Sequence, residues 1–350
     1  MATLTETTAA PATTTRLQAR GATIPLEPTG VLDVHKPKDL TPVLGTQFNK
    51  VQLSDLLAAP NADELLRELA IIISRRNVVF FKDQDRKLTD EEIKLLASKL
   101  GSLSGSTGKL HIHPTEYIPD PELSPITTSF IKRKPGTSLL AARGWHTDVA
   151  FEKHPSDFAI LNMYAIPENG GDTLWASGYE AYDRLTPAMA QWLEGLHAVY
   201  DGNGFHQRAA GLGIDVHLGP RGHPDNSGAD LSCVHPVIRT NPVTGWKSLF
   251  VNSAFTKRIV ELNKDESDKI LEYLFGLVSL NHDLQVRYKW DKNDVAIWSN
   301  TSSFHNVTVD YEGMDVRKGN RTVSVGEKPY LDPSSKSRRA ALGLPPFLSD

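Results

Sequence analysis

Apolar residues recur at helical spacing along 53–74, which predicts an amphipathic helix. The next run, 77–81, is β-branched and aromatic, which is typical of a buried strand. Thr89 and Glu92 form a capping-box pattern, so a second helix is predicted to begin there and to end at Gly101, where glycine can adopt a positive φ. The side chains expected to face the core from this second helix are Ile93, Leu95, Leu96 and Leu100.

The pattern changes after about residue 125, where short apolar or alternating runs are separated by Gly, Pro and Asn. Such runs predict strands, and strands at these intervals indicate a sandwich or a barrel. Two stretches with helical spacing, 178–198 and 256–280, interrupt them. The predicted fold class is therefore mainly β with flanking helices. The predicted strands are 158–164, 173–175, 248–251, 295–298 and 322–325.

The chain shows no clear linker and no internal repeat, so we expect one structured domain over 23–350. Residues 1–22 are rich in Thr and Ala and predict a disordered lead-in. Residues 201–246 contain many Gly, Pro, His and Asp with little periodicity. This composition predicts a long irregular insertion, and such insertions are often functional.

The composition excludes several classes of protein. With 39% hydrophobic and 23% charged residues, the chain is typical of a globular protein and not of a disordered one. The formal charge of −4 provides no basic excess for nucleic acid. No apolar run approaches the roughly 20 residues that cross a bilayer, so no membrane partner is expected.

A cytoplasmic location is expected, because the N-terminus lacks the apolar block of a secretory signal. Cys233 is the only cysteine, which excludes an internal disulfide and a cysteine-based zinc site and fits a reducing compartment. The two arginines and one acid in the first 20 residues leave an organelle-targeting interpretation open.

The stretch from Gly144 to Asp148 carries the most informative chemistry. On extended backbone the side chains at i and i+2 point to one face, so His146 and Asp148 can offer an imidazole and a carboxylate to one metal ion. His305, which follows the apolar run 294–298, is the best candidate for a third ligand. Two histidines and one carboxylate with open positions are the ligand set of non-haem Fe(II) oxygenases. A His-x-Asp triplet is weak evidence by itself in a chain with 12 histidines, because most histidines only hydrogen-bond locally.

Five separated blocks supply stronger evidence. They are 78–83, 111–114, 145–175, 297–298 (placed seven residues before His305) and 321–329. Together and in this order they resemble the TauD/TfdA family of Fe(II)- and 2-oxoglutarate-dependent dioxygenases, including its fungal sulfonate dioxygenase-like members. The resemblance extends from about residue 45 to 330.

The resemblance implies a double-stranded β-helix (jelly roll) with flanking helices. It also implies that His146, Asp148 and His305 bind Fe(II), and that Thr173 and Arg317 bind the distal carboxylate of 2-oxoglutarate. For substrate binding it implies Arg321, His113 and Phe205. A solvated charge remains the alternative for Arg317, a strand-anchoring salt bridge for Arg321, and ordinary packing for His113 and Phe205. Family members often form oligomers, which leaves a homo-oligomer open.

Three departures from the family pattern bear on the site. The residues after the late strand are Trp298-Ser299-Asn300-Thr301 instead of Trp-Asp-Asn-Arg, so the groups that orient His305 are expected to differ. Residues 142–144 and Glu116 also replace residues that taurine-type members use. Taurine itself is therefore not the expected substrate.

The predicted function is oxidation of a C–H bond in a small anionic substrate (a sulfonate, sulfate ester or carboxylate), with O₂ and 2-oxoglutarate as co-substrates and succinate and CO₂ as products. The alternative is a biosynthetic oxidase that acts on an amino acid or secondary metabolite by hydroxylation, desaturation or oxidative cyclisation. Two further classes are a binding module with a decayed iron site and a zinc-dependent hydrolase.

Overall fold

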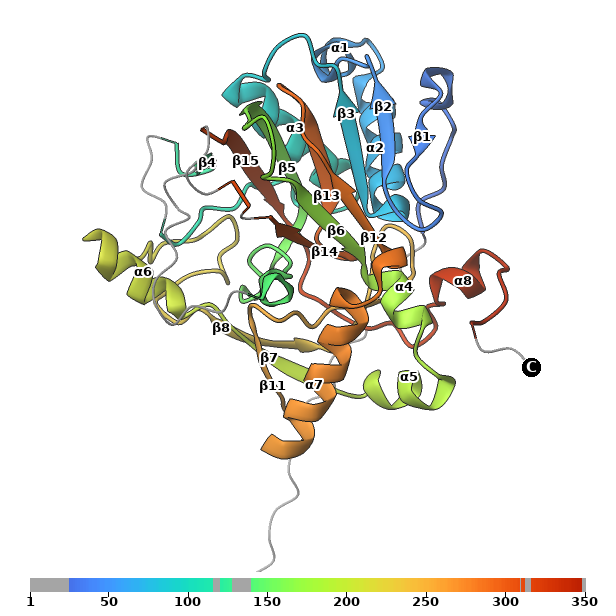
Figure 1. Cartoon of the computed structure of the whole chain (residues 1–350), viewed down its shortest axis with the longest axis vertical. Coiled ribbons are helices and arrows are strands. Elements are labelled where there is room, and N and C mark those ends of the chain that lie inside the picture. Colours follow the sequence, from blue (N-terminus) through green and yellow to red (C-terminus); the bar gives the residue numbers. More distant parts are fainter. Residues whose placement is uncertain (1–24, 116–119, 128–139, 309, 312–315, 348–350) are drawn as a thin grey trace, which may run out of the picture.

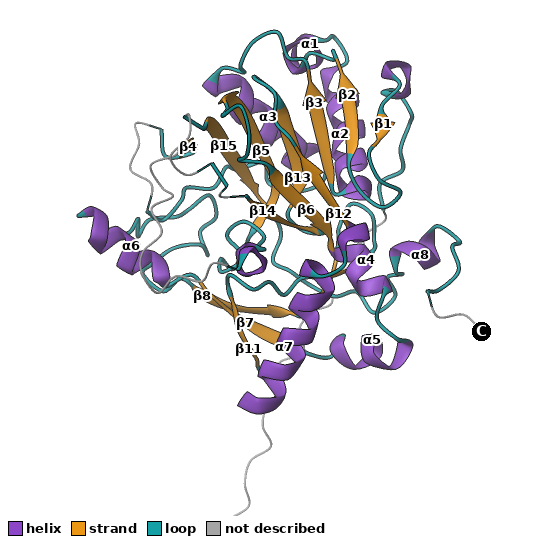
Figure 2. Cartoon of the chain, viewed as in Figure 1, coloured by secondary structure: helices purple, strands orange, loops and turns teal. Residues whose placement is uncertain are grey.

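The computed structural model describes residues 25–115, 120–127, 140–308, 310–311 and 316–347. The predicted lead-in at 1–22 and Glu116 lie outside the described residues. Figures 1 and 2 show a mainly β molecule with helices packed along its sheets, as the sequence predicts. Across the described ranges, no helix combines the length and the apolar character needed to cross a bilayer.

The largest sheet has seven strands in the order β1-β2-β3-β13-β5-β15-β4. Its neighbours are antiparallel, except that β2 and β3 are parallel. The strands are β1 (Lys38–Asp39), β2 (Thr46–Asn49), β3 (Val78–Lys82), β4 (Ser124–Thr127), β5 (Ser156–Ala165), β13 (Val295–Ser299) and β15 (Lys318–Val325).

Three smaller sheets complete the β structure. The sheet β12-β6-β14 carries candidate site residues and consists of β6 (Thr173–Ser177), β12 (Gln285–Tyr288) and β14 (Ser303–Val307). A second sheet, β11-β7-β8, lies in the lower half of Figure 1 and consists of β7 (His197–Asp201), β8 (Ser232–Pro236) and β11 (Thr256–Ile259). The third is the pair β9 (Ile238–Thr240) and β10 (Lys247–Leu249).

Helices cover the outer faces of these sheets. Figure 1 shows α2 and α3 on one face of the large sheet and α7 near β7 and β11. The α-helices are α1 (Leu53–Ala58), α2 (Ala62–Arg76), α3 (Asp90–Leu103), α4 (Gly178–Asp183), α5 (Pro187–Leu193), α6 (Gly204–Leu212), α7 (Lys264–Ser279) and α8 (Arg338–Ala341). Among the described residues, the short 3₁₀ helices are η1 (Asp33–His35), η3 (Ala141–Gly144) and η4 (His282–Leu284).

The central strands of the large sheet are apolar on both faces. In β3, Val79 and Phe81 belong to the core shared with α2 and α3, whereas Val78 and Phe80 belong to the core shared with β6 and β12. Side chains alternate between the two faces of a strand, so a sheet covered on both sides needs continuous apolar runs. This double burial explains the unbroken apolar character that identified β3 and β13 in the sequence.

Aromatic side chains join the large sheet to the sheet β12-β6-β14. Phe80 of β3 stacks on Tyr288 of β12, with ring centroids 4.1 Å apart, and meets Trp175 of β6 edge-on at 5.2 Å. Trp175 also lies 5.6 Å from Trp298 of β13. Such aromatic pairs stabilise a core beyond the burial of their area. The two sheets therefore pack face to face and hold β6 and β14 in fixed positions.

The predicted capping box is confirmed, but the predicted end of its helix is wrong. The hydroxyl of Thr89 accepts from the backbone N–H of Glu92 at 3.1 Å, and the Glu92 carboxylate accepts from the N–H of Thr89 at 2.8 Å. Gly101 lies within α3, which continues to Leu103. A Cβ at Gly101 would stand 3.3 Å from both the Cα of Gly108 and the Cβ of Ser324. Glycine is therefore needed there for close packing and not for a positive φ.

Three helical predictions require correction. The stretch 53–74 is two helices, α1 and α2, because Pro60 lies at the junction and proline cannot continue a helix. The stretch 178–198 is α4 and α5 followed by the start of β7, with Thr186 capping α5. In 256–280 the first four residues are strand β11, and α7 begins after Asn263, which forms a capping box with Glu266.

The irregular stretch is narrower than predicted. Residues 201–246 include α6, β8 and β9, and the longest part without regular structure is 213–231. Buried side chains of 213–231 hydrogen-bond to the chain that follows Asp148. The amide of Asn226 pairs with the backbone of His154, accepting from its N–H at 2.9 Å and donating to its carbonyl at 2.7 Å.

A buried ion pair makes the strongest connection. The Arg221 guanidinium is fully buried and donates to both carboxylate oxygens of Glu152, with 3.0 Å between Nη2 and Oε2. Nη1 of Arg221 donates to the carbonyls of His217 at 3.0 Å and Gly228 at 3.2 Å. His111 adds a contact of 3.2 Å from its Nε2 to Oε1 of Glu152. The network joins three separate segments: 111–114, the chain after Asp148, and 213–231.

Replacing Glu152 with Gln is expected to lower the free energy of unfolding by about 3–5 kcal/mol, because the buried Arg221 loses its carboxylate. Burial raises the pKa of Glu152, but hydrogen bonds from His111 and Arg221 outweigh it and hold the pKa below the ordinary 4.5. The ionised carboxylate therefore stabilises the fold above pH 4.5, and this stabilisation is lost as the pH falls through the lowered pKa. Urea unfolding at several pH values measures both effects.

Asp268→Asn is the control for this experiment, because it breaks the exposed pair of Lys264 and Asp268 and should change stability little. Equal losses in the two variants would contradict the role of the buried pair. So would a Glu152→Gln effect that stays constant below pH 4.5.

The single domain over 23–350, the cytoplasmic location and the homo-oligomer stay predictions.

Candidate active site

The two predicted histidine ligands face each other across a backbone pair. The N–H of His146 donates to the carbonyl of His305 at 3.1 Å, and the N–H of His305 donates back at 2.8 Å. The two residues thus form an isolated antiparallel bridge between the chain after η3 and strand β14. A directly hydrogen-bonded antiparallel pair holds its side chains side by side. The imidazole centroids are accordingly 4.1 Å apart, with the rings tilted by 46°.

Asp148 completes the predicted set. Its Oδ1 lies 3.7 Å from Nε2 of His305, and one donor atom from each of the three residues lies within 4.8 Å of the other two. Asp148 and His305 are buried, and His146 is half-buried. The structure therefore brings the three side chains to one point, as the sequence predicts.

Both imidazoles are in the form that binds a metal ion. The Nδ1–H of His146 donates to the carbonyl of Gly144 at 2.8 Å, which leaves the Nε2 lone pair for a ligand. Burial lowers the pKa of His146, and burial together with His146 lowers the pKa of His305 to about 3. Metal-binding histidines must be neutral, so the residues present fit a divalent metal ion.

The charge of Asp148 is maintained by its neighbours. Burial acts to raise its pKa, but the charge of Arg321 and a hydrogen bond from Asn300 act against burial, and its pKa lies below the ordinary value. Nη1 of Arg321 donates to Oδ1 of Asp148 at 2.6 Å. The carboxylate is therefore an anionic donor at every physiological pH.

Asn300 is a positioning residue that the sequence analysis missed. Its Oδ1 accepts from the N–H of Asp148 at 3.0 Å and from Nε1 of Trp298 at 3.1 Å. Its Nδ2 donates to Oδ2 of Asp148 at 3.1 Å and to the hydroxyl of Ser156 at 2.9 Å. The amide thus fixes both the backbone and the carboxylate of Asp148. The departure noted at 298–301 pointed to this segment but not to this residue.

Different contacts hold the side chains of His305 and Asp148 in place. Its Nδ1 is buried and has no hydrogen-bond partner within the part of the chain that the structure describes. Ser299 replaces the family's Asp, and its hydroxyl lies 2.7 Å from the hydroxyl of Thr301. The ring of Trp298 packs against His305 at a centroid distance of 4.9 Å. Packing and the backbone pair therefore hold this imidazole.

Thr173 and Arg317 lie together, as expected for two residues that bind one carboxylate. Nη2 of Arg317 is 3.4 Å from the Thr173 hydroxyl, and Nε donates to the carbonyl of Gly171 at 3.0 Å. Nε1 of Trp290 donates to the same hydroxyl at 3.1 Å. A hydroxyl has two acceptor positions and one proton. With N–H groups of Trp290 and Arg317 at its oxygen, Thr173 has its proton available for an anion. Trp290 had not been identified from the sequence.

One cavity, of about 280 Å³, is lined by three of these residues, His146, Asp148 and Arg317. The residues predicted to contact substrate, Arg321, His113 and Phe205, all line it, and the rings of His113 and Phe205 meet edge-on at 4.9 Å. The remaining lining residues are Pro125, Ile126, Thr127, His146, Asp148, Val149, Phe151, Arg208, Phe255, Val307, Tyr311 and Arg317. The sequence analysis had not singled out Phe151, Phe255 or Arg208.

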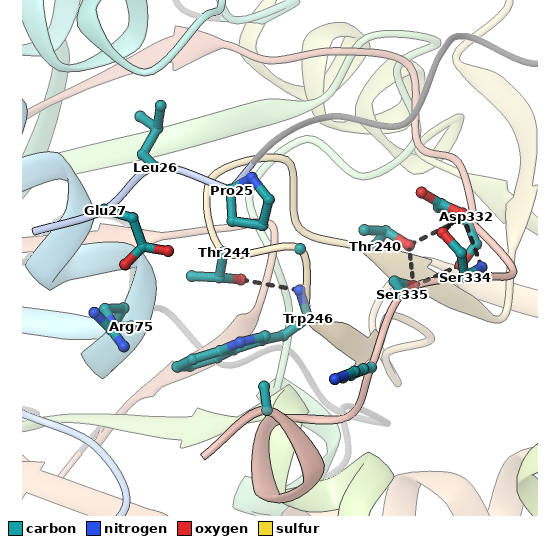
Figure 3. A pocket seen from close by; sticks show the side chains of 13 residues that line it. Pro25, Leu26, Glu27, Arg75, Thr240, Thr244, Trp246, Asp332, Ser334 and Ser335 are labelled. Carbon is teal, nitrogen blue, oxygen red and sulfur yellow. Dashed lines mark hydrogen bonds between the residues drawn. The ribbon is translucent and has the colours of Figure 1, made fainter. Parts of the chain in front are cut away.

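A second cavity, of about 430 Å³, lies beside Trp246 (Figure 3). The described residues that line it include no histidine or cysteine. Its hydroxyl groups bond within the chain, with 2.9 Å between those of Thr240 and Ser335 and 3.2 Å from the N–H of Trp246 to the hydroxyl of Thr244. The candidate active site is therefore the smaller cavity.

Comparisons with known proteins agree with this assignment. Residues 36–323 match the family described as "Taurine catabolism dioxygenase TauD, TfdA family". The alpha-ketoglutarate-dependent dioxygenase esdpJ of Penicillium shearii is 42% identical, and the match covers 91% of this chain and 96% of that protein. The alpha-ketoglutarate-dependent sulfonate dioxygenase of Saccharomyces cerevisiae is 34% identical, with 85% and 68% covered. A crystal structure of a taurine dioxygenase from Burkholderia xenovorans superposes with a TM-score of 0.67 at 26% identity, with 85% and 91% covered, which supports the predicted jelly roll.

Replacing Asn300 with Asp is expected to weaken binding of Mn(II), a redox-stable probe of the triad, by about 10–100-fold. The change keeps the shape of the side chain but places a second carboxylate where an N–H donates to Asp148. Calorimetric titration measures the affinity. Asn241→Asp is the control, because Asn241 is a buried amide that bonds to Thr301 and not to Asp148. Equal Mn(II) affinity in both variants would contradict the role of Asn300.

Proposed function

Because this chain belongs to the TauD/TfdA family of dioxygenases, we propose that it is a 2-oxoglutarate-dependent enzyme that uses Fe(II) and O₂ to oxidise a C–H bond of a small anionic substrate. The observation that carries the proposal is the convergence of His146, Asp148 and His305 beside Arg317 and Thr173. His146, Asp148 and Arg317 line one cavity, and His305 and Thr173 contact them, so a metal triad and an anion-binding pair would meet the two needs of such an enzyme.

The three ligand side chains fit iron. His146 and His305 would each donate a neutral nitrogen and Asp148 an anionic oxygen, which is the ligand set of non-haem Fe(II) oxygenases. When bound, the iron supplies the oxidative chemistry in which 2-oxoglutarate and O₂ give succinate, CO₂ and an oxidised substrate. The protein positions the reactants and limits access of water.

Arg317 and Thr173 would bind the distal carboxylate of 2-oxoglutarate. Burial lowers the pKa of Arg317, but a guanidinium remains charged at physiological pH. Its planar fork can donate two parallel hydrogen bonds to a carboxylate, and the Thr173 hydroxyl can add a third. Charge also balances: Fe(II) with Asp148 carries one positive charge, the 2-oxoglutarate dianion reverses it, and Arg317 neutralises the remainder.

Arg321 and His113 would bind the anionic group of the substrate. Arg321 lines the cavity next to the triad, and its guanidinium has more donors than its bond to Asp148 uses. His113 is held neutral, because burial and the neighbouring Arg321 lower its pKa, and it can still offer a hydrogen bond. Phe205 would form the apolar wall beside them.

The Saccharomyces cerevisiae relative named as a sulfonate dioxygenase supports an anionic substrate. The aromatic walls of the cavity favour the biosynthetic alternative, an oxidase of an amino acid or secondary metabolite. The ring centroid of Phe151 lies 5.4 Å from that of Phe205 and 5.2 Å from that of Phe255. Succinate formation over a panel of alkyl sulfonates, sulfate esters, aryloxyacids and amino acids distinguishes the two.

His146→Ala is expected to abolish succinate formation that depends on Fe(II), 2-oxoglutarate and O₂, while the protein stays folded. The variant removes one ligand but leaves the backbone pair with His305 intact. The assay is succinate release, with circular dichroism to check the fold. His206→Ala is the control, because His206 bonds to the carbonyl of Ala229. Turnover retained in His146→Ala would remove this residue from the ligand set, and turnover without O₂ or 2-oxoglutarate would favour a hydrolase.

Arg317→Ala is expected to raise the KM for 2-oxoglutarate by about 10–100-fold, the range for losing a charged hydrogen bond to a carboxylate. The KM for substrate should change little, because Arg321 would bind that anion. Steady-state kinetics with each reactant varied in turn measures both constants, with Arg321→Ala as the opposite case. A rise confined to the substrate KM in Arg317→Ala would mean that the two arginines have exchanged roles.

A further inference from the structure

We propose a second metal site, for Zn(II), formed at the surface of the protein by His154, His223 and Asp225, which we call the surface group. Across the described ranges, two sets of three side chains could hold a metal ion, and the surface group is the one outside the active site. None of its members lines the active-site cavity. The inference therefore does not depend on the proposed function.

The distances between the ligand atoms suit a tetrahedral zinc ion. Oδ2 of Asp225 lies 3.2 Å from Nε2 of His154 and 3.8 Å from Nδ1 of His223. Nitrogen and oxygen ligands at about 2.0–2.1 Å from a tetrahedral Zn(II) ion lie about 3.3–3.5 Å from one another. In the active site, the corresponding distance between Asp148 and His305 is 3.7 Å. The surface group is therefore about as compact as the triad.

Both imidazoles of the surface group are suited to a metal ion. Nδ1 of His223 accepts from the backbone N–H of Asp225 at 3.1 Å, so this nitrogen has a lone pair and the proton is on Nε2. A metal ion would replace this N–H as the partner of Nδ1. Burial and the neighbouring His223 lower the pKa of His154, which favours the neutral form that binds metals. The two rings stack with their centroids 3.6 Å apart.

The backbone holds the ligands in place without a metal ion. His223 and Asp225 lie in one turn, in which the N–H of Arg221 donates to the carbonyl of Asn226 at 2.8 Å. The N–H of Asn226 donates to the carbonyl of His223 at 3.0 Å. The side chain of Asn226 also hydrogen-bonds to both the N–H and the carbonyl of His154. Because the two segments are already joined, metal binding has little chain to order.

The exposure of the surface group leaves room for a fourth ligand. The side chains of His154 and His223 are 15% and 24% exposed, and that of Asp225 is 60% exposed. A water molecule can therefore complete the tetrahedron. Imidazole and carboxylate are both ligands of zinc. The bound ion would link 213–231 to the chain just before β5 and so stabilise the folded state.

The test counts zinc ions by calorimetric titration of Zn(II) into the full-length protein. The triad is also expected to bind zinc, so the wild-type protein should bind two ions per chain. His223→Ala should bind one ion, at the triad, and His146→Ala should bind one ion, at the surface group. The double variant should bind neither ion. Asp225→Asn serves in place of His223→Ala if that variant does not fold.

His197→Ala is the matched control. His197 is an exposed histidine whose Nδ1 lies 2.9 Å from Oε1 of Glu261, but the described residues supply no third ligand there. This variant should keep the wild-type number of zinc ions. The loss of an ion in His197→Ala as well as in His223→Ala would overturn the inference, because it would show scattered binding to surface histidines.

Urea unfolding provides a second measurement. Excess Zn(II) should raise the unfolding midpoint of His146→Ala more than that of the double variant, because a ligand stabilises the state that binds it. An equal number of zinc ions in wild-type protein and His223→Ala would overturn the inference. So would a His146→Ala protein that binds no zinc, or the same zinc-dependent shift of the midpoint with and without His223.

Discussion

The backbone pair between His146 and His305 is the constraint on which the site depends. Two hydrogen bonds hold these residues opposite each other, although they are far apart in sequence. Strand β14 is in turn in register with β6, where His305 faces Trp175 and Val307 faces Thr173. The register of β14 against β6 therefore places His305 on the same face of the sheet as Thr173. A slip of β14 by one residue in this pairing would turn His305 to the face opposite Thr173.

Burial and hydrogen bonding set the protonation states of the three side chains that the backbone brings together. Buried imidazoles stay neutral because burial penalises their charged form, whereas the buried Asp148 stays ionised because Arg321 and Asn300 hydrogen-bond to its carboxylate. Asn300 then uses all its hydrogen-bonding positions to fix that carboxylate and its surroundings. The same low-dielectric environment strengthens the field of each arginine in the cavity. A site of this kind favours anionic ligands before any specific contact is considered.

The sequence predicted the parts of the molecule that depend on local pattern. The central strands were recognisable because both of their faces are buried, and His146 and Asp148 because two-residue spacing puts them on one face. Breaks at Pro60 and before Thr186 were missed, since helical spacing continues through both junctions. Asn300, Trp290 and Arg208 were missed for a different reason. Asn300 acts on a residue 152 positions away, and no short-range pattern marks such a partner.

The ion pair of Glu152 and Arg221 links the chain that follows Asp148 to the irregular stretch after α6. Glu152 follows Asp148 by four residues, whereas Arg221 belongs to the irregular stretch between α6 and β8. A chimera that replaces 201–246 with a segment lacking this arginine would leave the buried Glu152 carboxylate without its guanidinium partner. Transplanting new specificity into this scaffold therefore requires both segments to be exchanged as one module.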